Sequence, residues 1–304
     1  MISPGKLWWQ FSRDVKRGWD ATYHHRVTLP RVEDWFWPYW SEPAGTVPVH
    51  VLTGENDWRL SAWMLASFFH FTERAWPIVF HDDGTLSHDA RATLGELFPE
   101  AELKTRAEAD AIMGRVLRAY PFCEEYRRTH PLALKIFDVP HTASSDRFFL
   151  IDSDVLFFQR PAEILAWADA PERAECWFNE DVQEAALLSA GEAREELDVK
   201  LWSRVNSGLC LINRSAIDLE LCDRALATTS ILRGPIWRIE QTLFALCASR
   251  HALGGLLPQT YEVSLKKRGH PDAIARHYVG AVRDRFFAEG LKRLREPLLE
   301  LEPD

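Results

Sequence analysis

The chain has 304 residues, of which 46% are hydrophobic and 27% are charged. This composition is too apolar for a disordered chain and is typical of a globular protein. Lys and Arg number 36 against 45 Asp and Glu, which gives a net charge of −9 and argues against a general role in binding nucleic acid. The sequence shows neither a signal peptide nor an apolar run of about 18 residues, so we expect a cytoplasmic protein without a membrane span.

Two residue types stand out in the composition. The five cysteines include no CxxC pair, so we expect reduced thiols in the core. Of the 13 tryptophans, seven fall in the first 58 residues, and Trp35-Phe36-Trp37-Pro38-Tyr39-Trp40 is too dense for one element to bury. We therefore predict an aromatic-rich N-terminal extension over residues 1–46. Its tryptophans either pack or form a surface that stacks on a sugar or contacts a partner or a membrane.

The first elements alternate between strand and helix. An apolar strand over 47–52 is closed by Thr53-Gly54, and apolar residues at helical spacing follow over 57–72. A second strand over 76–80 is closed by Asp82-Asp83-Gly84, and Ser87 is placed to cap a helix that runs to about residue 97. This order predicts an α/β fold with a parallel sheet and crossover helices.

The later elements include one unusually apolar strand. Arg147 to Ile151 is apolar on both faces, which is typical of a strand in the middle of a sheet. It leads into Asp152-Ser153-Asp154. The other expected elements are helical segments over 108–139, a surface helix over 184–200, a strand over 206–212, a helix after Asn213, a helix over 239–249 and an amphipathic tail from 281.

Asp152 and Asp154 indicate a metal site. Ligands of open parallel sheets bind at the carboxyl ends of the strands, which is where this pair falls. Residues i and i+2 of an extended chain point the same way, so both carboxylates can converge. Two buried like charges need a cation, and hard oxygen ligands suit Mg²⁺ or Mn²⁺.

Two enzyme classes place such a pair after an apolar strand. The sequence Asp152-Ser153-Asp154-Val155 resembles the first motif of haloacid-dehalogenase-type phosphatases, in which the first Asp is a nucleophile. That motif usually opens its domain, whereas here two strand–helix units precede it. The further phosphatase motifs are not evident after residue 154.

The other class is the nucleotide-sugar glycosyltransferases. The chain resembles GT-A-fold enzymes of the retaining, glycogenin-like and lipopolysaccharide-galactosyltransferase-like group over roughly residues 47–287. Six motifs in order carry the resemblance: Leu52-Thr53-Gly54, Leu134 to Pro140, Phe149 to Val155, Val205 to Asn213, Glu240-Gln241 and His277-Tyr278-Val279-Gly280. The chain departs from the group at Lys135, where Arg is common, at Glu240, where Asp is usual, and after Gly280.

The resemblance implies a fold, an activity and a set of site residues. The fold is α/β GT-A, with a mostly parallel central sheet flanked by helices, as a single catalytic domain over 47–304. The activity is metal-dependent sugar transfer from a nucleoside-diphosphate sugar, expected to be a UDP-sugar, with retention of configuration. The acceptor is an unidentified glycan, lipid-linked or protein molecule. A non-catalytic protein on the same fold is the alternative within this resemblance.

The resemblance also assigns a role to each site residue. Asp152, Asp154 and His277 hold Mn²⁺ or Mg²⁺. The catalytic candidates are Glu240 and Gln241, near the anomeric carbon, and Asn206, which hydrogen-bonds hydroxyls of the donor sugar. The donor is bound by Thr53, Gly54, Asp82, Lys135, Asp152, Ser153, Asn206, Ser207, Gly208, Gly280 and Arg283. Asp83 and Arg285 are further candidates for binding the donor. Glu180 and Asp181 are candidates either for contacting the acceptor or for acting as a base.

Overall fold

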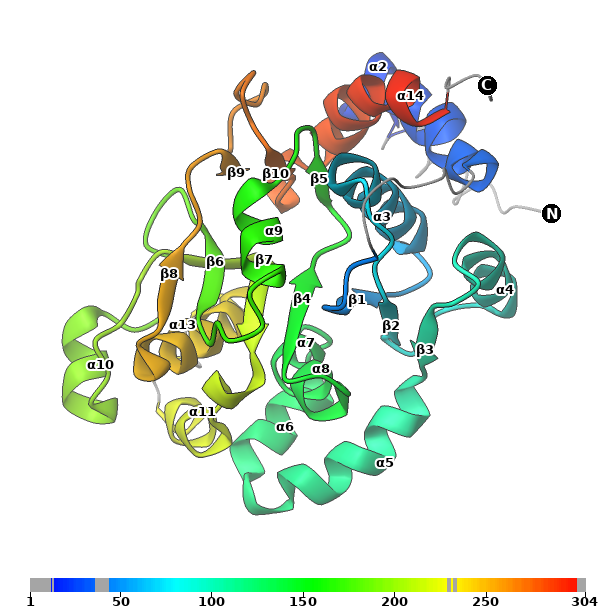
Figure 1. Ribbon diagram of the computed structural model, residues 1–304. Helices are drawn as coiled ribbons and strands as arrows, with labels where there is room; N and C mark the ends of the chain where they lie inside the picture. Colours follow the sequence, from blue (N-terminus) through cyan, green and yellow to red (C-terminus); the bar gives the residue numbers. More distant parts are fainter. Residues whose placement is uncertain (1–11, 13, 36–43, 229–230, 232–233, 300–304) are drawn as a thin grey trace.

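The computed structural model describes residues 12, 14–35, 44–228, 231 and 234–299, and it contains two sheets (Figure 1). The larger sheet has seven strands in the order β3-β2-β1-β4-β7-β6-β8, and the smaller has three in the order β5-β10-β9. The strands are β1 (Val49–Thr53), β2 (Ile78–Asp82), β3 (Glu102–Lys104), β4 (Arg147–Ile151), β5 (Val155–Phe157), β6 (Cys176–Glu180), β7 (Val205–Asn213), β8 (Gly254–Leu256), β9 (Tyr261–Val263) and β10 (Ala275–His277).

The large sheet is mostly parallel, as predicted, but its centre is mixed. β1 pairs in parallel with β2 and β4, β2 with β3, and β6 with β8. β7 alone runs antiparallel to both of its neighbours, β4 and β6. The beginning of β7 therefore lies at the same edge of the sheet as the end of β4. This reversal brings residues from two distant segments to one place.

Helices cover the sheet on both sides, as Figure 1 shows. The α-helices are α2 (Trp19–Tyr23), α3 (Trp58–Thr72), α4 (His88–Leu97), α5 (Arg106–Val116), α6 (Pro121–Thr129), α7 (Ala133–Ile136), α8 (Asp138–Thr142), α9 (Ala162–Ala168), α10 (Ala190–Leu197), α11 (Leu219–Leu226), α13 (Ile239–His251) and α14 (Lys292–Leu299). Short 3₁₀ or π segments are η1 (His24–Thr28), η2 (Leu29–Asp34), η3 (Leu117–Ala119), η4 (Arg214–Ala216), η5 (Ile236–Arg238), η6 (Gly280–Val282) and η7 (Phe286–Leu291).

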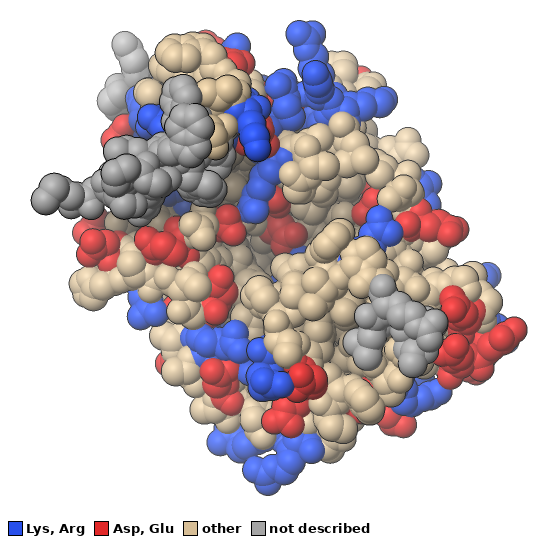
Figure 2. Space-filling view, turned by 180° about the vertical axis from the view of Figure 1, so that it is seen from behind, with Lys and Arg blue, Asp and Glu red and all other residues tan. Residues whose placement is uncertain are grey.

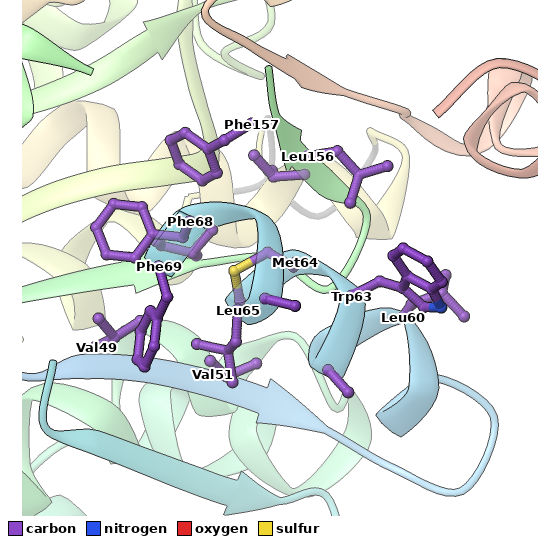
Figure 3. Close-up of a cluster of buried hydrophobic side chains, with 14 of the residues drawn as sticks. Val49, Val51, Leu60, Trp63, Met64, Leu65, Phe68, Phe69, Leu156 and Phe157 are labelled. Atoms are coloured by element: carbon purple, nitrogen blue, oxygen red, sulfur yellow. The ribbon is translucent and has the colours of Figure 1, made fainter. Parts of the chain in front are cut away.

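The core has two apolar clusters, one of which is built around α3. Most of this helix is buried, because its apolar residues extend over nearly its whole circumference. Figure 3 shows its side chains between Val51 of β1 and Phe157 of β5. The second cluster packs α7, α11 and α13 against β7. β4 is buried on both faces, which confirms the expectation of a central strand. All five cysteines are buried and carry free thiols.

The N-terminal segment packs on the C-terminal one. Arg17 Nε donates to Asp284 Oδ1 at 2.7 Å, and Figure 1 shows α2 beside α14. Trp63 Nε1 of α3 donates to the carbonyl oxygen of Leu29 at 2.9 Å. Trp37 and Trp40 of the aromatic cluster lie outside the described residues, and the boundary at residue 46 stays a prediction. In the described part of the chain, every helix is too short or too polar to cross a membrane.

Some predicted elements have different limits in the structure. The surface helix expected over 184–200 is α10 alone, which begins with a capping box at Ser189. The segment after Asn213 is the short η4. The helix that follows begins three residues after η4 ends, at Leu219, where Asp218 caps it. The strands β3, β5, β6, β8, β9 and β10 were not predicted. Five of these six have three residues each, which is too short for a hydrophobic period to emerge.

Candidate functional site

Three potential metal ligands meet where β4 ends. Asp152 and Asp154 lie in the turn between β4 and β5, and His277 ends β10, opposite Val155 of β5. His277 Nε2 lies 3.1 Å from Asp154 Oδ1 and 3.8 Å from Asp152 Oδ2. One donor atom from each residue falls within 4.8 Å of the other two. The structure therefore brings together the carboxylate pair and the histidine, which is 123 residues further along the chain than Asp154.

Asn206 fixes the orientation of His277. Its Oδ1 accepts from the backbone N–H of Gly208 at 3.1 Å, so this atom is the amide oxygen. His277 Nδ1 lies 2.8 Å from the same oxygen and therefore carries the donated proton. Asn206 Nδ2 donates to Asp181 Oδ2 at 2.9 Å. In this tautomer the lone pair of His277 Nε2 faces the two aspartates, as a metal-ligating imidazole requires.

The imidazole and the carboxylates shift one another's pKa. Burial by itself raises the pKa of Asp154, but His277, Arg283 and Lys135 outweigh it and hold that pKa below its usual value. Burial by itself lowers the pKa of His277, but Asp154 and Asp152 raise it above the usual value. Both shifts share one interaction, since the imidazolium form of His277 and the carboxylate form of Asp154 stabilise each other.

Lys135 is buried between two carboxylates. Its Nζ lies 2.9 Å from Asp152 Oδ1 and 3.1 Å from Glu240 Oε1, and it donates to the carbonyl oxygen of Ser207 at 3.0 Å. Burial opposes its charge, but Asp152 and Glu240 raise the pKa of Lys135 above its usual range. Burial also raises the pKa of Glu240, whose Oε2 accepts from the Ser207 hydroxyl. Lys135 is thus a structural counter-charge within the site.

Arg283 connects the metal-ligand cluster to the start of α3. Its Nη2 donates to Asp57 Oδ1 at 3.0 Å, and its Nε lies 3.5 Å from Asp154 Oδ2. Burial raises the pKa of Asp57; Arg283 opposes the rise, whereas Asp154, Asp83 and Asp152 add to it. The sequence marked Asp57 only as the beginning of a helix, because nothing local indicates its neighbours in space.

A cavity of about 680 Å³ opens beside these residues. Figure 2 shows acidic side chains set back in a hollow on the face that it draws, with basic side chains around it. The cavity is lined by these predicted site residues: Lys135, Asp152, Asp154, Asn206, Ser207, Glu240, Gln241, His277, Gly280 and Arg283. Asp181, a candidate for the acceptor, lines it as well.

The other predicted donor residues do not line this cavity: Thr53, Gly54, Asp82, Ser153 and Gly208. Asp82 is turned toward its own loop and accepts from the backbone N–H of Gly84 and from Arg91. Thr53 accepts from Ser61 at 2.9 Å. These contacts support the turns that close β1 and β2.

The two glycines predicted at the site differ in their surroundings. A Cβ on Gly208 would lie 2.2 Å from His277 Nδ1, so the imidazole packs directly against this backbone. A Cβ on Gly280 would meet no atom within 4 Å. Gly208 is therefore required by the packing of His277, whereas the protein itself places no such demand on Gly280.

Comparisons with known proteins show the fold. No family model and no curated protein sequence matches the chain. The galactosyltransferase LgtC, solved with donor and acceptor sugar analogues, superposes with a TM-score of 0.52 at 12% identity, over 85% of this chain and 98% of that one. Mouse xyloside xylosyltransferase 1 superposes with a TM-score of 0.51 at 13% identity, over 78% and 99%.

The bifunctional glycosyltransferase WbbM gives a TM-score of 0.52 at 15% identity. This match covers 81% of the present chain but only 47% of WbbM, so the chain spans about half the length of that protein. The three structures share little sequence with this chain. What they have in common with it is the arrangement of strands and helices. The chain therefore has the fold of the GT-A glycosyltransferases.

Proposed function

We propose that this protein is a metal-dependent glycosyltransferase that takes a sugar from a nucleoside-diphosphate sugar. The observation that carries this proposal is the convergence of Asp152, Asp154 and His277 at the edge of the sheet where β4 ends, within a GT-A fold. A UDP-sugar donor and retention of configuration come from the resemblance of the sequence alone. Determining the anomeric configuration of the product tests whether the configuration is retained.

The residues present fit a hard divalent cation. Four carboxylates gather here, those of Asp57, Asp152, Asp154 and Glu240, against the permanent cations Lys135 and Arg283. The two remaining negative charges match one divalent ion. Asp152, Asp154 and His277 would hold Mg²⁺ or Mn²⁺, which when bound neutralises the charge that develops on the departing diphosphate.

The other side chains of the cavity bind and orient the donor. Arg283 is half-exposed, so its guanidinium group is available to a diphosphate oxygen. Lys135 holds Asp152 and Glu240 in place and keeps their mutual repulsion small. Gln241 Nε2 lies 3.4 Å from Asp181 Oδ2, and both side chains border the space that a sugar would occupy.

The phosphatase alternative has less support. A nucleophilic Asp152 would need the further phosphatase motifs, which are not evident in the sequence after residue 154. The fold is also that of the GT-A proteins. Two strand–helix units precede the Asp152 motif, whereas the corresponding phosphatase motif usually opens its domain. A non-catalytic protein of this fold would bind the nucleotide without turnover, which the experiment below distinguishes.

Titration calorimetry with UDP, in Mn²⁺ and in EDTA, tests the proposal. We expect binding in Mn²⁺ and at least about ten-fold weaker binding both in EDTA and in Asp154→Asn, since even an outer partner of a metal ligand is worth about that factor. Asp146→Asn, at a carboxylate that is 76% exposed, is the matched control and should bind like the wild type. Equal affinity in EDTA would overturn the metal site, and a screen of nucleotide sugars for hydrolysis separates an enzyme from a binding protein.

A further inference from the structure

Three exposed apolar side chains line the cavity beside the metal-ligand cluster. Val182 is 42% exposed, Trp237 is 63% exposed and Leu265 is 55% exposed, and all three line the cavity. They come from separate segments, namely the loop after β6, the turn η5 and the loop after β9. A protein surface rarely gathers large apolar groups from three segments beside a polar site unless a ligand covers them.

Trp237 lies on the side of the site away from β1 and β2. It precedes Glu240 by three residues and Gln241 by four, so it is placed just before the first turn of α13, which packs against β7. The metal-ligand cluster at the end of β4 lies between β7 and β1 in the sheet. Trp237 is therefore separated by that cluster from the turns after β1 and β2. Arg283, the proposed diphosphate ligand, pairs with Asp57 after β1, which leaves the side of the cavity at Trp237 for the acceptor.

The neighbours of Trp237 are polar groups suited to hydroxyls. Asp181, Gln183 and Gln241 line the same cavity and offer carboxylate and amide oxygens together with amide N–H groups. A pyranose ring carries hydroxyls on its rim and C–H groups on its faces, so it can use an indole face and these polar groups at once. An acyl chain would cover the indole but would form no hydrogen bonds with the polar groups of Asp181, Gln183 and Gln241.

We propose that Trp237 is a stacking platform for a pyranose ring of the acceptor, which makes the acceptor a carbohydrate. This inference rests on the proposed function, because it assumes that the neighbouring cavity holds a sugar donor. The indole face covers the C–H face of the acceptor ring, while Asp181 and Gln241 bind its hydroxyls. Val182 and Leu265 shield the ring edge from water.

Saturation-transfer NMR with methyl pyranosides of glucose, galactose, mannose, N-acetylglucosamine and xylose tests the platform. Each glycoside is measured with and without UDP and Mn²⁺, on the wild type, Trp237→Ala, Trp237→Phe and the control Trp19→Ala. Trp19 is 86% exposed and belongs to α2, and it does not line the cavity. We expect saturation on the ring C–H protons of at least one glycoside, with an affinity about ten-fold lower in Trp237→Ala and largely kept in Trp237→Phe.

The outcomes separate this inference from the proposed function. If the wild type binds UDP with Mn²⁺ but none of the glycosides, the donor site stands and the platform is refuted. If a glycoside binds equally well to Trp237→Ala, the platform is refuted as well. If Trp237→Ala instead weakens the binding of UDP, the indole serves the nucleotide and the inference is wrong. If the wild type does not bind UDP with Mn²⁺, the proposed function itself is refuted. The measurements without nucleotide then still decide whether Trp237 binds a sugar.

Discussion

Lys135→Met removes the buried counter-charge of the site, and the structure gives the magnitude of its effect. The side chains of Lys135 and Glu240 are each only 2% exposed, so the substitution leaves Glu240 and Asp152 without their shared cation. Breaking a buried ion pair from one side costs about 3–5 kcal/mol, because the remaining charge stays desolvated. Against a domain stability of about 5–15 kcal/mol, a loss of this size is readily measured.

Urea unfolding without divalent cations measures this loss. The matched control is Lys292→Met, whose ion pair with Asp20 is exposed on both sides and is worth about 0–1 kcal/mol. Adding Glu240→Gln to Lys135→Met removes one of the two stranded charges and should recover about 0.5–3 kcal/mol. If Lys135→Met costs no more than the control, or if the second substitution recovers nothing, Lys135 does not act as the buried counter-charge described above.

Two further predictions follow from packing and from burial. Gly208→Ala should displace His277 and abolish Mn²⁺-dependent nucleotide binding, whereas Gly280→Ala should bind normally; calorimetry on both checks this, and equal binding would contradict the packing argument. Burial, with a smaller contribution from Lys104, lowers the pKa of His50 to about 3, so the fold favours the neutral imidazole and loses stability as the pH falls from 6.5 toward 3. At pH 5 this loss is about 2 kcal/mol. Urea unfolding at pH 7.5 and 5.0 should therefore show a correspondingly smaller loss in His50→Gln, and an equal loss would contradict the assignment.

The strand before the carboxylate pair was predicted correctly because its signal is local. Arg147 to Ile151 is apolar on both faces, and only a central strand buries both faces of such a segment. The position of Asp152 and Asp154 at its end then follows from chain order alone. The Ser87 cap and the limits of α3 and α13 were likewise encoded in a few neighbouring residues.

The structure decided what Asn206 contacts. The sequence placed Asn206 at the start of a strand, and the resemblance gave it a contact with sugar hydroxyls. In the structure β7 is antiparallel to β4, so Asn206 lies at the edge where β4 ends and its amide is engaged by His277 and Asp181. Strand direction depends on pairing between distant segments, which no local pattern reports.

The sequence by itself determined where the carboxylate pair stands, because an apolar strand followed by two aspartates is a pattern within eight residues. Only the tertiary structure decided how that pair is balanced. The ion pair of Lys135 with Glu240 joins residues 105 positions apart, and Trp237 reaches the cavity through the packing of α13 on β7. Contacts of this kind form only when the chain folds, since burial gives them their strength and burial is a property of the whole core.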